Sequence, residues 1–308
     1  MSRGRPLLQA PQIDMRHTVI DRPGGASIAV YEYGPPDGDP VVLVHGFAVS
    51  ARYWHPQING LADRFRVIAY DQRGHGRSEI GGGSMSNDHL GQDLAAVLEH
   101  AVAESRPAVV VGHSMGGMSV MSWATQYPSE VGRHARSIML AGTAATAPVM
   151  KGPVRLASPV TLLRRVQYEA AWLAFRAIHR PGGDLLMHSG MVAAGAVFPG
   201  ASRAQLAFLG EILRDTDWRT REKVGRALEN LNVARGLSAM SVPVAVLVGG
   251  RDRLTPPRLA VPLAEALHHA GSLERFETWR NATHLLNWEQ PHRFNAVIAD
   301  LAAVESSR

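Results

Sequence analysis

The stretch Pro107-Ala-Val-Val-Val-Gly-His-Ser-Met-Gly-Gly117 reads as a buried strand that runs into a helix across a single serine, Ser114. Residues 109–111 are all valine, the short β-branched run expected of a strand that is covered on both faces. A helical pattern follows and continues without a breaker to Pro128, which gives a helix of about a dozen residues. The sequence therefore predicts a strand, a tight turn and a helix, with Ser114 in the turn.

The turn matches the pattern G-x-S-x-G, with Gly112 and Gly116 on either side of the serine. Glycines at these positions let strand and helix approach each other, and the serine hydroxyl is presented at the sheet edge on a strained backbone. The N-terminus of the helix carries partial positive charge, so the N–H of Met115 can point at a developing oxyanion. A glycine-rich turn without chemistry is the alternative, but the strand before it and the helix after it favour a nucleophile.

The composition is that of an ordinary globular protein, because 45% of the 308 residues are hydrophobic and 19% are charged. No cysteine is present, which excludes disulfides, thiol nucleophiles and cysteine metal sites and fits a reducing compartment. The first residues lack a secretory apolar region, and no run of about 20 apolar residues predicts a membrane span, so we expect a cytoplasmic location. The net charge of +5 comes from arginines scattered among acids, which argues against a nucleic-acid partner.

The rest of the chain alternates predicted strands with predicted helices. An alternating pattern on both sides of Pro23-Gly-Gly25 predicts an antiparallel hairpin. Apolar runs predict further strands on both sides of the serine turn, at residues 41–44, 65–70, 109–111, 137–141, 243–248 and 273–279. Helical spacing between these runs predicts crossover helices, so the expected fold class is α/β, with a mostly parallel, eight-stranded, doubly wound sheet.

Two helix starts are predicted from capping residues. Thr255 is followed by two prolines, which indicates an N-cap with proline at the helix start. Asn287, with Gln290 three residues further on, is the expected cap of the final helix.

Residues 146–236 break the alternation, because helical spacing is found there without a convincing strand pattern. We therefore expect a helical cap, or lid, inserted between core segments 1–145 and 237–308. Within it, residues 185–202 carry no Asp, Glu, Lys or Arg and include two methionines. The composition of this segment is consistent with three alternatives: buried packing within the lid, an apolar pocket wall, or a surface for peripheral lipid contact.

Ser114 needs a base and a group that orients the base, because a serine hydroxyl is a poor nucleophile at neutral pH. Asp252 follows the strand at 243–248, and His284 lies in the loop beyond the strand at 273–279. Ligand sites of open α/β sheets gather at such carboxyl ends of strands. Considered alone, Asp252 is more typical of a turn or helix cap. His284 is one of fourteen histidines, most of which must be surface or packing residues. Together with Ser114 they predict a catalytic triad.

Two further strand ends carry candidate residues. His45-Gly46-Phe47 ends the strand at 41–44, and the N–H of Phe47 is the candidate second donor of an oxyanion hole, beside that of Met115. The loop at residues 71–78 combines glycines with charges, and we favour a structural role for its Asp71 and His75 over a catalytic one. No histidine or carboxylate cluster has metal-ligand spacing, so neither a metal nor a cofactor is expected.

Five short motifs follow the predicted strands in turn: His45-Gly-Phe47, Asp71-Gln-Arg-Gly-His-Gly-Arg-Ser78, Gly112-His-Ser-Met-Gly-Gly117, Gly250-Arg-Asp252 and Thr283-His284. In this combination, and with a helical insertion at the usual cap position, the chain resembles the α/β-hydrolase superfamily over nearly its full length. The resemblance implies esterases, lipases, carbon–carbon bond hydrolases and cofactor-free perhydrolases. Epoxide hydrolases and haloalkane dehalogenases carry aspartate at the nucleophile position, so Ser114 argues against both.

The resulting functional prediction is a serine hydrolase of the esterase or lipase type that cleaves carboxylic esters with an apolar acyl chain. Ser114 attacks the carbonyl, His284 transfers the proton, Asp252 orients the imidazole, and the Phe47 and Met115 N–H groups bind the oxyanion. The alternatives are a perhydrolase, a carbon–carbon bond hydrolase on the same triad, and a non-catalytic ligand receptor. The expected partner is a small-molecule ester, whose identity the sequence does not predict; neither does it predict the oligomeric state.

Overall fold

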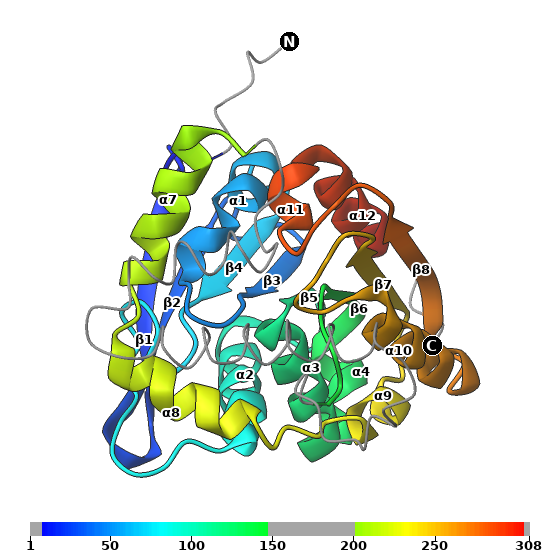
Figure 1. Cartoon of the computed structure of the whole chain (residues 1–308), viewed down its shortest axis with the longest axis horizontal. Coiled ribbons are helices and arrows are strands. Elements are labelled where there is room, and N and C mark those ends of the chain that lie inside the picture. Colours follow the sequence, from blue (N-terminus) through cyan, green and yellow to red (C-terminus); the bar gives the residue numbers. More distant parts are fainter. Residues whose placement is uncertain (1–7, 147–200, 305–308) are drawn as a thin grey trace, which may run out of the picture.

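An eight-stranded sheet forms the centre of the computed structural model, which describes residues 8–146 and 201–304 (Figure 1). In sheet order the strands are β1 (Met15–Arg22), β2 (Ala26–Tyr33), β4 (Arg66–Tyr70), β3 (Pro40–Val44), β5 (Ala108–His113), β6 (Ala135–Ala141), β7 (Val244–Gly249) and β8 (Leu273–Trp279). β2 pairs antiparallel with β1 and with β4, and every other neighbouring pair in this order is parallel. The predicted eight-stranded, mostly parallel, doubly wound sheet is confirmed.

Strand residues alternate between two hydrophobic cores, one on each face of the sheet. In β3, Val42 and Val44 pack into the first core, whereas Val41 and Leu43 pack into the second. All four side chains are fully buried. This burial on both faces explains why the central strands read as continuous apolar runs rather than as alternating patterns.

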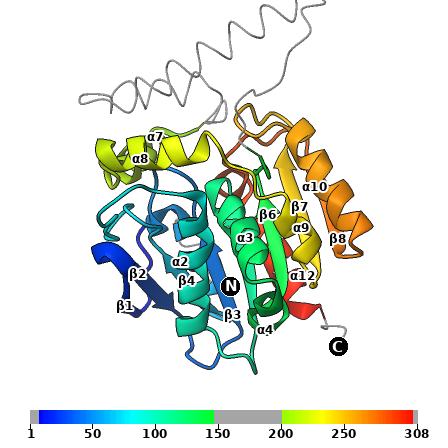
Figure 2. The same cartoon turned by 90° about the horizontal axis from the view of Figure 1, so that it is seen from below.

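Helices cover both faces of this sheet (Figures 1 and 2). The first core is covered by α2 (Asn87–Ala101), α3 (Met115–Gln126), α4 (Val131–His134), α9 (Arg235–Ala239) and α10 (Pro257–His269). The second core is covered by η2 (Ala51–Trp54), α1 (His55–Leu61), α11 (Leu286–Glu289) and α12 (Pro291–Ala303). Because the central strands are parallel, the loops that follow them gather at one edge of the sheet.

Two more helices, α7 (Arg203–Arg214) and α8 (Trp218–Leu228), lie across one end of the sheet in Figure 2. They match the helical spacing found in this part of the sequence. Ser50 Oγ, in the loop after β3, donates a hydrogen bond to Asp215 Oδ2 beside α7 at 2.7 Å. Thus α7 lies at the carboxyl ends of the parallel strands.

The predicted cap at residues 146–236 is described only in part. Its first residue, Thr146, forms an isolated antiparallel bridge with Asn232, so the two ends of the insertion lie side by side. Residues 147–200 fall outside the described residues, and with them most of the apolar segment at 185–202. The division into core and cap stays a prediction.

Both predicted helix caps are wrong. Helix α10 has Pro256 as its N-cap, because the Thr255 hydroxyl lies 2.7 Å from the Gly142 carbonyl instead of capping the helix. The final helix, α12, has Gln290 as its N-cap, and Asn287 lies inside the preceding short helix, α11. The Asn287 side chain is fully buried and takes part in a hydrogen-bond network described below.

Replacing Gly116 by alanine tests the close packing of α3 on β3. A Cβ at this position would collide with the main-chain carbonyl group of Val44, which cannot move without displacing a central strand. We expect Gly116→Ala to lower the free energy of unfolding by about 3 kcal/mol, the upper end of the usual range for overpacking, as measured by urea denaturation. Gly132→Ala is the matched control, because its Cβ would meet only Ser241 Oγ at 3.6 Å. An equal loss of stability in the two variants would contradict this account.

Candidate active site

Ser114 lies in the turn between β5 and α3 and has a strained backbone. Its φ is 53° and its ψ is −120°. Among the described non-glycine residues, Ser114 and Ala48 have a positive φ. The Ser114 N–H donates to the Ala141 carbonyl at 3.0 Å, and its carbonyl accepts from the Thr143 hydroxyl at 2.7 Å. These bonds from the end of β6 and the loop after it hold the strained turn in place, with the Ser114 side chain partly exposed.

The glycines of the turn allow β5 and α3 to approach each other closely, as the sequence predicts. A Cβ at Gly112 would lie 2.7 Å from the Gly116 carbonyl oxygen, and one at Gly117 would lie 2.6 Å from Thr143 Cγ2. Only a residue without a side chain fits at these positions.

Asp252 and His284 are in direct contact, as predicted from their positions after β7 and β8. His284 Nδ1 donates to Asp252 Oδ2 at 2.9 Å. Asp252 Oδ1 accepts the N–H groups of Leu254 and Thr255 at 2.8 and 2.9 Å. Burial raises the pKa of Asp252, but the charge and hydrogen bond of His284 and the bonds from Thr255 outweigh it, so the pKa lies below its usual value. A buried carboxylate therefore accepts the Nδ1 proton and leaves Nε2 of His284 as the acceptor.

Ser114 is linked to this pair through His113, its neighbour in the chain. The His113 and His284 rings lie 4.8 Å apart, and His113 Nε2 is 2.9 Å from the His284 carbonyl oxygen. A Cβ at Gly142 would lie 3.5 Å from both Asp252 Oδ2 and His113 Nε2. The ends of β5, β6 and β7 and the loop after β8 thus meet at one place, although no direct hydrogen bond joins the described Ser114 and His284 side chains.

The loop after β3 lies against Ser114. A Cβ at Gly46 would be 3.2 Å from Ser114 Cβ, so the main chain that leads to Phe47 passes beside the serine. The next residue, Ala48, has a φ of 62°, and its N–H donates to His75 Nε2 at 3.1 Å. The two candidate oxyanion donors, Phe47 in the loop after β3 and Met115 at the start of α3, therefore both lie close to Ser114 along the main chain.

Asp71 and His75 brace this loop, as the structural interpretation of their segment predicts. Asp71 Oδ1 accepts the Ala51 N–H at 2.7 Å, and its Oδ2 accepts the Tyr31 hydroxyl at 2.8 Å. His75 Nδ1 donates to the Arg73 carbonyl at 3.0 Å, which leaves Nε2 to accept from Ala48. Both side chains are buried and act on the main chain of the loop after β3.

Several residues that reach the site were not singled out from the sequence. Glu289 accepts a hydrogen bond from the N–H of Thr283 at 2.9 Å, directly before His284. His113 occupies the variable position before the serine of the motif, and Tyr53 stacks on it at 5.0 Å with an angle of 25°. Two local features could have identified these residues: Glu289 lies five residues after His284, and His113 lies within the serine motif. The remaining contacts join segments that are far apart in the sequence.

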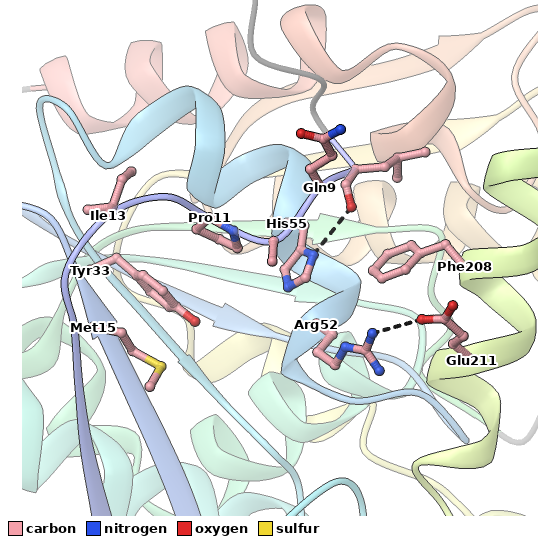
Figure 3. A pocket seen from close by; sticks show the side chains of 11 residues that line it. Gln9, Pro11, Ile13, Met15, Tyr33, Arg52, His55, Phe208 and Glu211 are labelled. Atoms are coloured by element: carbon pink, nitrogen blue, oxygen red, sulfur yellow. Dashed lines mark hydrogen bonds and ion pairs between the residues drawn. The ribbon is translucent and has the colours of Figure 1, made fainter.

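A cavity of about 510 Å³ lies elsewhere, between the N-terminal segment, α1 and α7 (Figure 3). Figure 3 shows His55 and Phe208 beside it and Arg52 paired with Glu211. Ser114, Asp252 and His284 are not among its lining residues, so it is separate from the site above. In the described parts of the chain, no side-chain cluster fits a metal ion and no helix is long and apolar enough to cross a membrane.

Three fully buried histidines predict how stability depends on pH, and His55, whose pKa burial lowers to about 4, adds to the same effect. Burial lowers the pKa of His45 to about 4, and burial with the charge of a neighbouring histidine lowers those of His75 and His113 to about 3. Unfolded histidines bind protons below about pH 6.5, whereas these three stay neutral in the fold. The free energy of unfolding should therefore fall as the pH falls from about 6.5 to 4, by roughly 1–2 kcal/mol per histidine at pH 5.

Urea denaturation at pH 7 and pH 5 measures this dependence. The raised pKa values of Asp71 and Glu289, both caused chiefly by burial, oppose it, because these carboxyls hold their protons to higher pH when folded. His75→Gln should weaken the dependence, whereas the same change at the exposed His100 should not. Equal pH dependence in the two variants would contradict the assignment.

Comparison with known proteins identifies the family and the fold. A sequence profile described as "Alpha/beta hydrolase family" matches residues 41–297. "Probable oxidoreductase EphD" of Mycobacterium tuberculosis is 36% identical over 115 residues, which are 37% of this chain and 19% of that protein. The "Bifunctional esterase/perhydrolase DCH" of Acinetobacter calcoaceticus is 37% identical over 107 residues, 34% of this chain and 38% of that protein. The chain thus spans well under half the length of these relatives.

Two further similarities extend over most of the chain. "3-oxoadipate enol-lactonase 2" of Acinetobacter baylyi is 27% identical over 270 residues, 86% of this chain and 89% of that protein. The crystal structure of a bromoperoxidase from Bacillus anthracis superposes with a TM-score of 0.74 at 20% identity and covers 93% of this chain and 99% of that one. At this identity the second similarity concerns the fold alone. The profile match and the shared fold together show that the chain belongs to the alpha/beta hydrolase family.

Proposed function

We propose that the protein is a serine hydrolase that cleaves carboxylic esters through an acyl-enzyme intermediate. The observation that carries this proposal is the 2.9 Å hydrogen bond between His284 Nδ1 and Asp252 Oδ2, in a loop that packs on the residue next to Ser114. A strained serine at a strand-to-helix turn, a histidine and a buried carboxylate that orients it are the three parts that acyl transfer needs.

In the proposed reaction, Ser114 Oγ attacks the ester carbonyl carbon and gives its proton to His284 Nε2. Asp252 keeps the Nδ1 proton in place and stabilises the imidazolium that forms. The carbonyl oxygen becomes negative and accepts hydrogen bonds from the Phe47 and Met115 N–H groups. The imidazolium then protonates the leaving alcohol, and a water molecule, deprotonated by His284, releases the acid. No step requires a cofactor.

The names of two relatives support ester chemistry. One is an esterase and perhydrolase, and the other is an enol-lactonase, whose name denotes a cyclic ester as substrate. We propose an apolar acyl chain because of the uncharged segment at 185–202. Cytoplasmic location remains part of the proposal, because the absence of cysteine from the sequence fits a reducing compartment.

A second candidate activity is perhydrolysis, which the esterase/perhydrolase relative favours. Here hydrogen peroxide replaces water in the second half of the reaction. It attacks the Ser114 acyl ester, gives a proton to His284 and leaves as the peroxy acid. The triad and the oxyanion donors keep their roles, so only the acceptor differs between the two activities.

Replacing the nucleophile tests the mechanism. Ser114→Ala should lower kcat for a p-nitrophenyl ester by about 10⁴-fold or more, because no acyl-enzyme can form. Asp252→Asn should also lower kcat strongly, since the amide favours the wrong imidazole tautomer. A fluorophosphonate probe should label the wild type and not Ser114→Ala. A folded Ser114→Ala variant with wild-type ester hydrolysis would show that the mechanism is wrong.

A series of p-nitrophenyl esters of increasing acyl length tests the substrate class. We expect kcat/KM to rise from acetyl to longer acyl chains, because each buried CH₂ contributes about 0.8 kcal/mol. Adding hydrogen peroxide and measuring peroxy acid decides between water and peroxide as acceptor. A kcat/KM that falls steadily from the acetyl ester onward would contradict the apolar acyl preference.

A further inference from the structure

A string of buried hydrogen bonds runs from α1 to the main chain of His284. Gln57 Nε2 donates to the Asn287 carbonyl at 3.2 Å, and Asn287 Nδ2 donates back to Gln57 Oε1 at 3.0 Å. The Tyr53 hydroxyl donates to Asn287 Oδ1 at 2.6 Å. His113 Nε2 lies 3.3 Å from the Tyr53 oxygen and 2.9 Å from the His284 carbonyl oxygen. All five residues are buried.

The direction of these bonds fixes the tautomer of His113. The pairing with Gln57 turns the Asn287 oxygen toward Tyr53, whose single hydroxyl proton goes to that oxygen. The Tyr53 oxygen can then only accept, so His113 must carry its proton on Nε2. The same N–H points at the His284 carbonyl, which has no proton to give.

The His113 ring is also held by packing. It stacks on Tyr53 at 5.0 Å, meets Trp54 edge-on at 6.4 Å and lies 4.8 Å from the His284 ring. Tyr53 is fixed in turn by Trp288, which stacks on it at 5.4 Å and donates Nε1–H to its carbonyl at 2.8 Å. Burial, with the charge of His284, lowers the pKa of His113 to about 3, so the ring stays neutral at working pH. A neutral ring with one tautomer is a fixed donor.

We propose that His113 is a positioning residue for the base of the Ser114 site, because its Nε2–H holds the His284 main chain at a set distance from the adjoining nucleophile. This inference rests on the proposed function. Asp252, in the loop after β7, fixes the His284 ring, and His113, at the end of β5, fixes the His284 backbone. Anchors at two different strand ends therefore determine where His284 Nε2 lies. His113 directly precedes Ser114, so the position of the His284 base is fixed relative to the strand that leads to the nucleophile.

The consequence is kinetic. A displacement of about 1 Å in a reacting group can cost about 10²-fold in rate. Substrate binding outside the triad does not depend on this bond. Loss of the His113 donor should therefore lower kcat and leave KM nearly unchanged.

Substitutions that separate the donor from the ring volume test the proposal. His113→Phe keeps an aromatic ring against Tyr53 but has no donor, and it should lower kcat for a p-nitrophenyl ester by about 10- to 10²-fold. In His113→Gln the amide N–H reaches about as far as Nε2 of histidine, so most of the loss should be recovered. In His113→Asn the amide is too short to reach the His284 carbonyl, so kcat should fall as in His113→Phe. His113→Asn replaces His113→Phe in the test if the phenylalanine variant does not fold.

The control is His55→Phe, because His55 is likewise buried and stacked on an aromatic ring, Phe208, but takes no part in this string. Its kcat should remain at the wild-type value. Urea denaturation of all variants separates loss of fold from loss of rate. A folded His113→Phe variant with wild-type kcat, a His113→Gln variant as slow as His113→Asn, or a loss confined to KM would overturn the proposal.

Ser114→Ala separates this result from failure of the proposed function. If it hydrolyses esters as the wild type does, the proposed reaction is wrong, whatever the His113 variants show. The rate at which a fluorophosphonate probe labels Ser114 requires the base but no ester. If no ester is turned over, labelling that is slowed in His113→Phe and restored in His113→Gln still supports the positioning role, and equal labelling rates overturn it.

Discussion

The close approach of the turn after β5 to the end of β3 is the constraint on which the rest of this structure depends. Gly116 leaves room for the Val44 carbonyl, and Gly46 leaves room for Ser114. Within this packing Ser114 has a φ of 53°, a backbone conformation that costs about 1–3 kcal/mol. The bond from the Ser114 N–H to the Ala141 carbonyl and the bond from the Thr143 hydroxyl to the Ser114 carbonyl offset the strain. The end of β6 and the loop after it therefore help to hold the strained serine in place.

Burial then decides which groups around Ser114 carry charge. Transfer from water disfavours the charged form of every buried group. For His45, His75 and His113 no carboxylate bond compensates, so these rings are neutral and serve as hydrogen-bond partners of fixed tautomer. Asp252 stays ionised because His284 and the main chain after β7 bond to it. Asp252 thus places a buried negative charge where an imidazolium would form in the proposed reaction.

The fold and the contact between Asp252 and His284 could be predicted from the sequence, because both depend on local patterns. Continuous apolar runs reveal central strands, and the residue after such a strand must lie at the carboxyl edge of the sheet. The string from Gln57 to His113 could not be predicted, since it joins α1, α11 and β5 through side chains far apart in the chain. Asn287 shows the reason. Its sequence context resembles a helix cap, and only its tertiary contacts with Tyr53 and Gln57 show its actual role.

Helix α7 contacts the loop after β3 and the short helix α11, which follows His284. Near its end, Asp215 accepts a hydrogen bond from Ser50 at 2.7 Å, in the loop that also carries Phe47. In its first half, Phe208 stacks at 5.5 Å on Trp288, which follows His284. The ion pairs of Arg52 with this helix are exposed and contribute little, about 0–1 kcal/mol.

The aromatic stack contributes about 0.5–1.5 kcal/mol beyond the area it buries. Burial of Leu209, Ile212 and Leu213 in the second core, together with this half-buried stack and the Ser50 bond, therefore fixes the position of α7 more than its exposed ion pairs do. Through Asp215 and Phe208, α7 thus contacts both the loop that carries Phe47 and the short helix that follows His284. A single helix therefore joins two segments of the proposed site that lie far apart in the sequence.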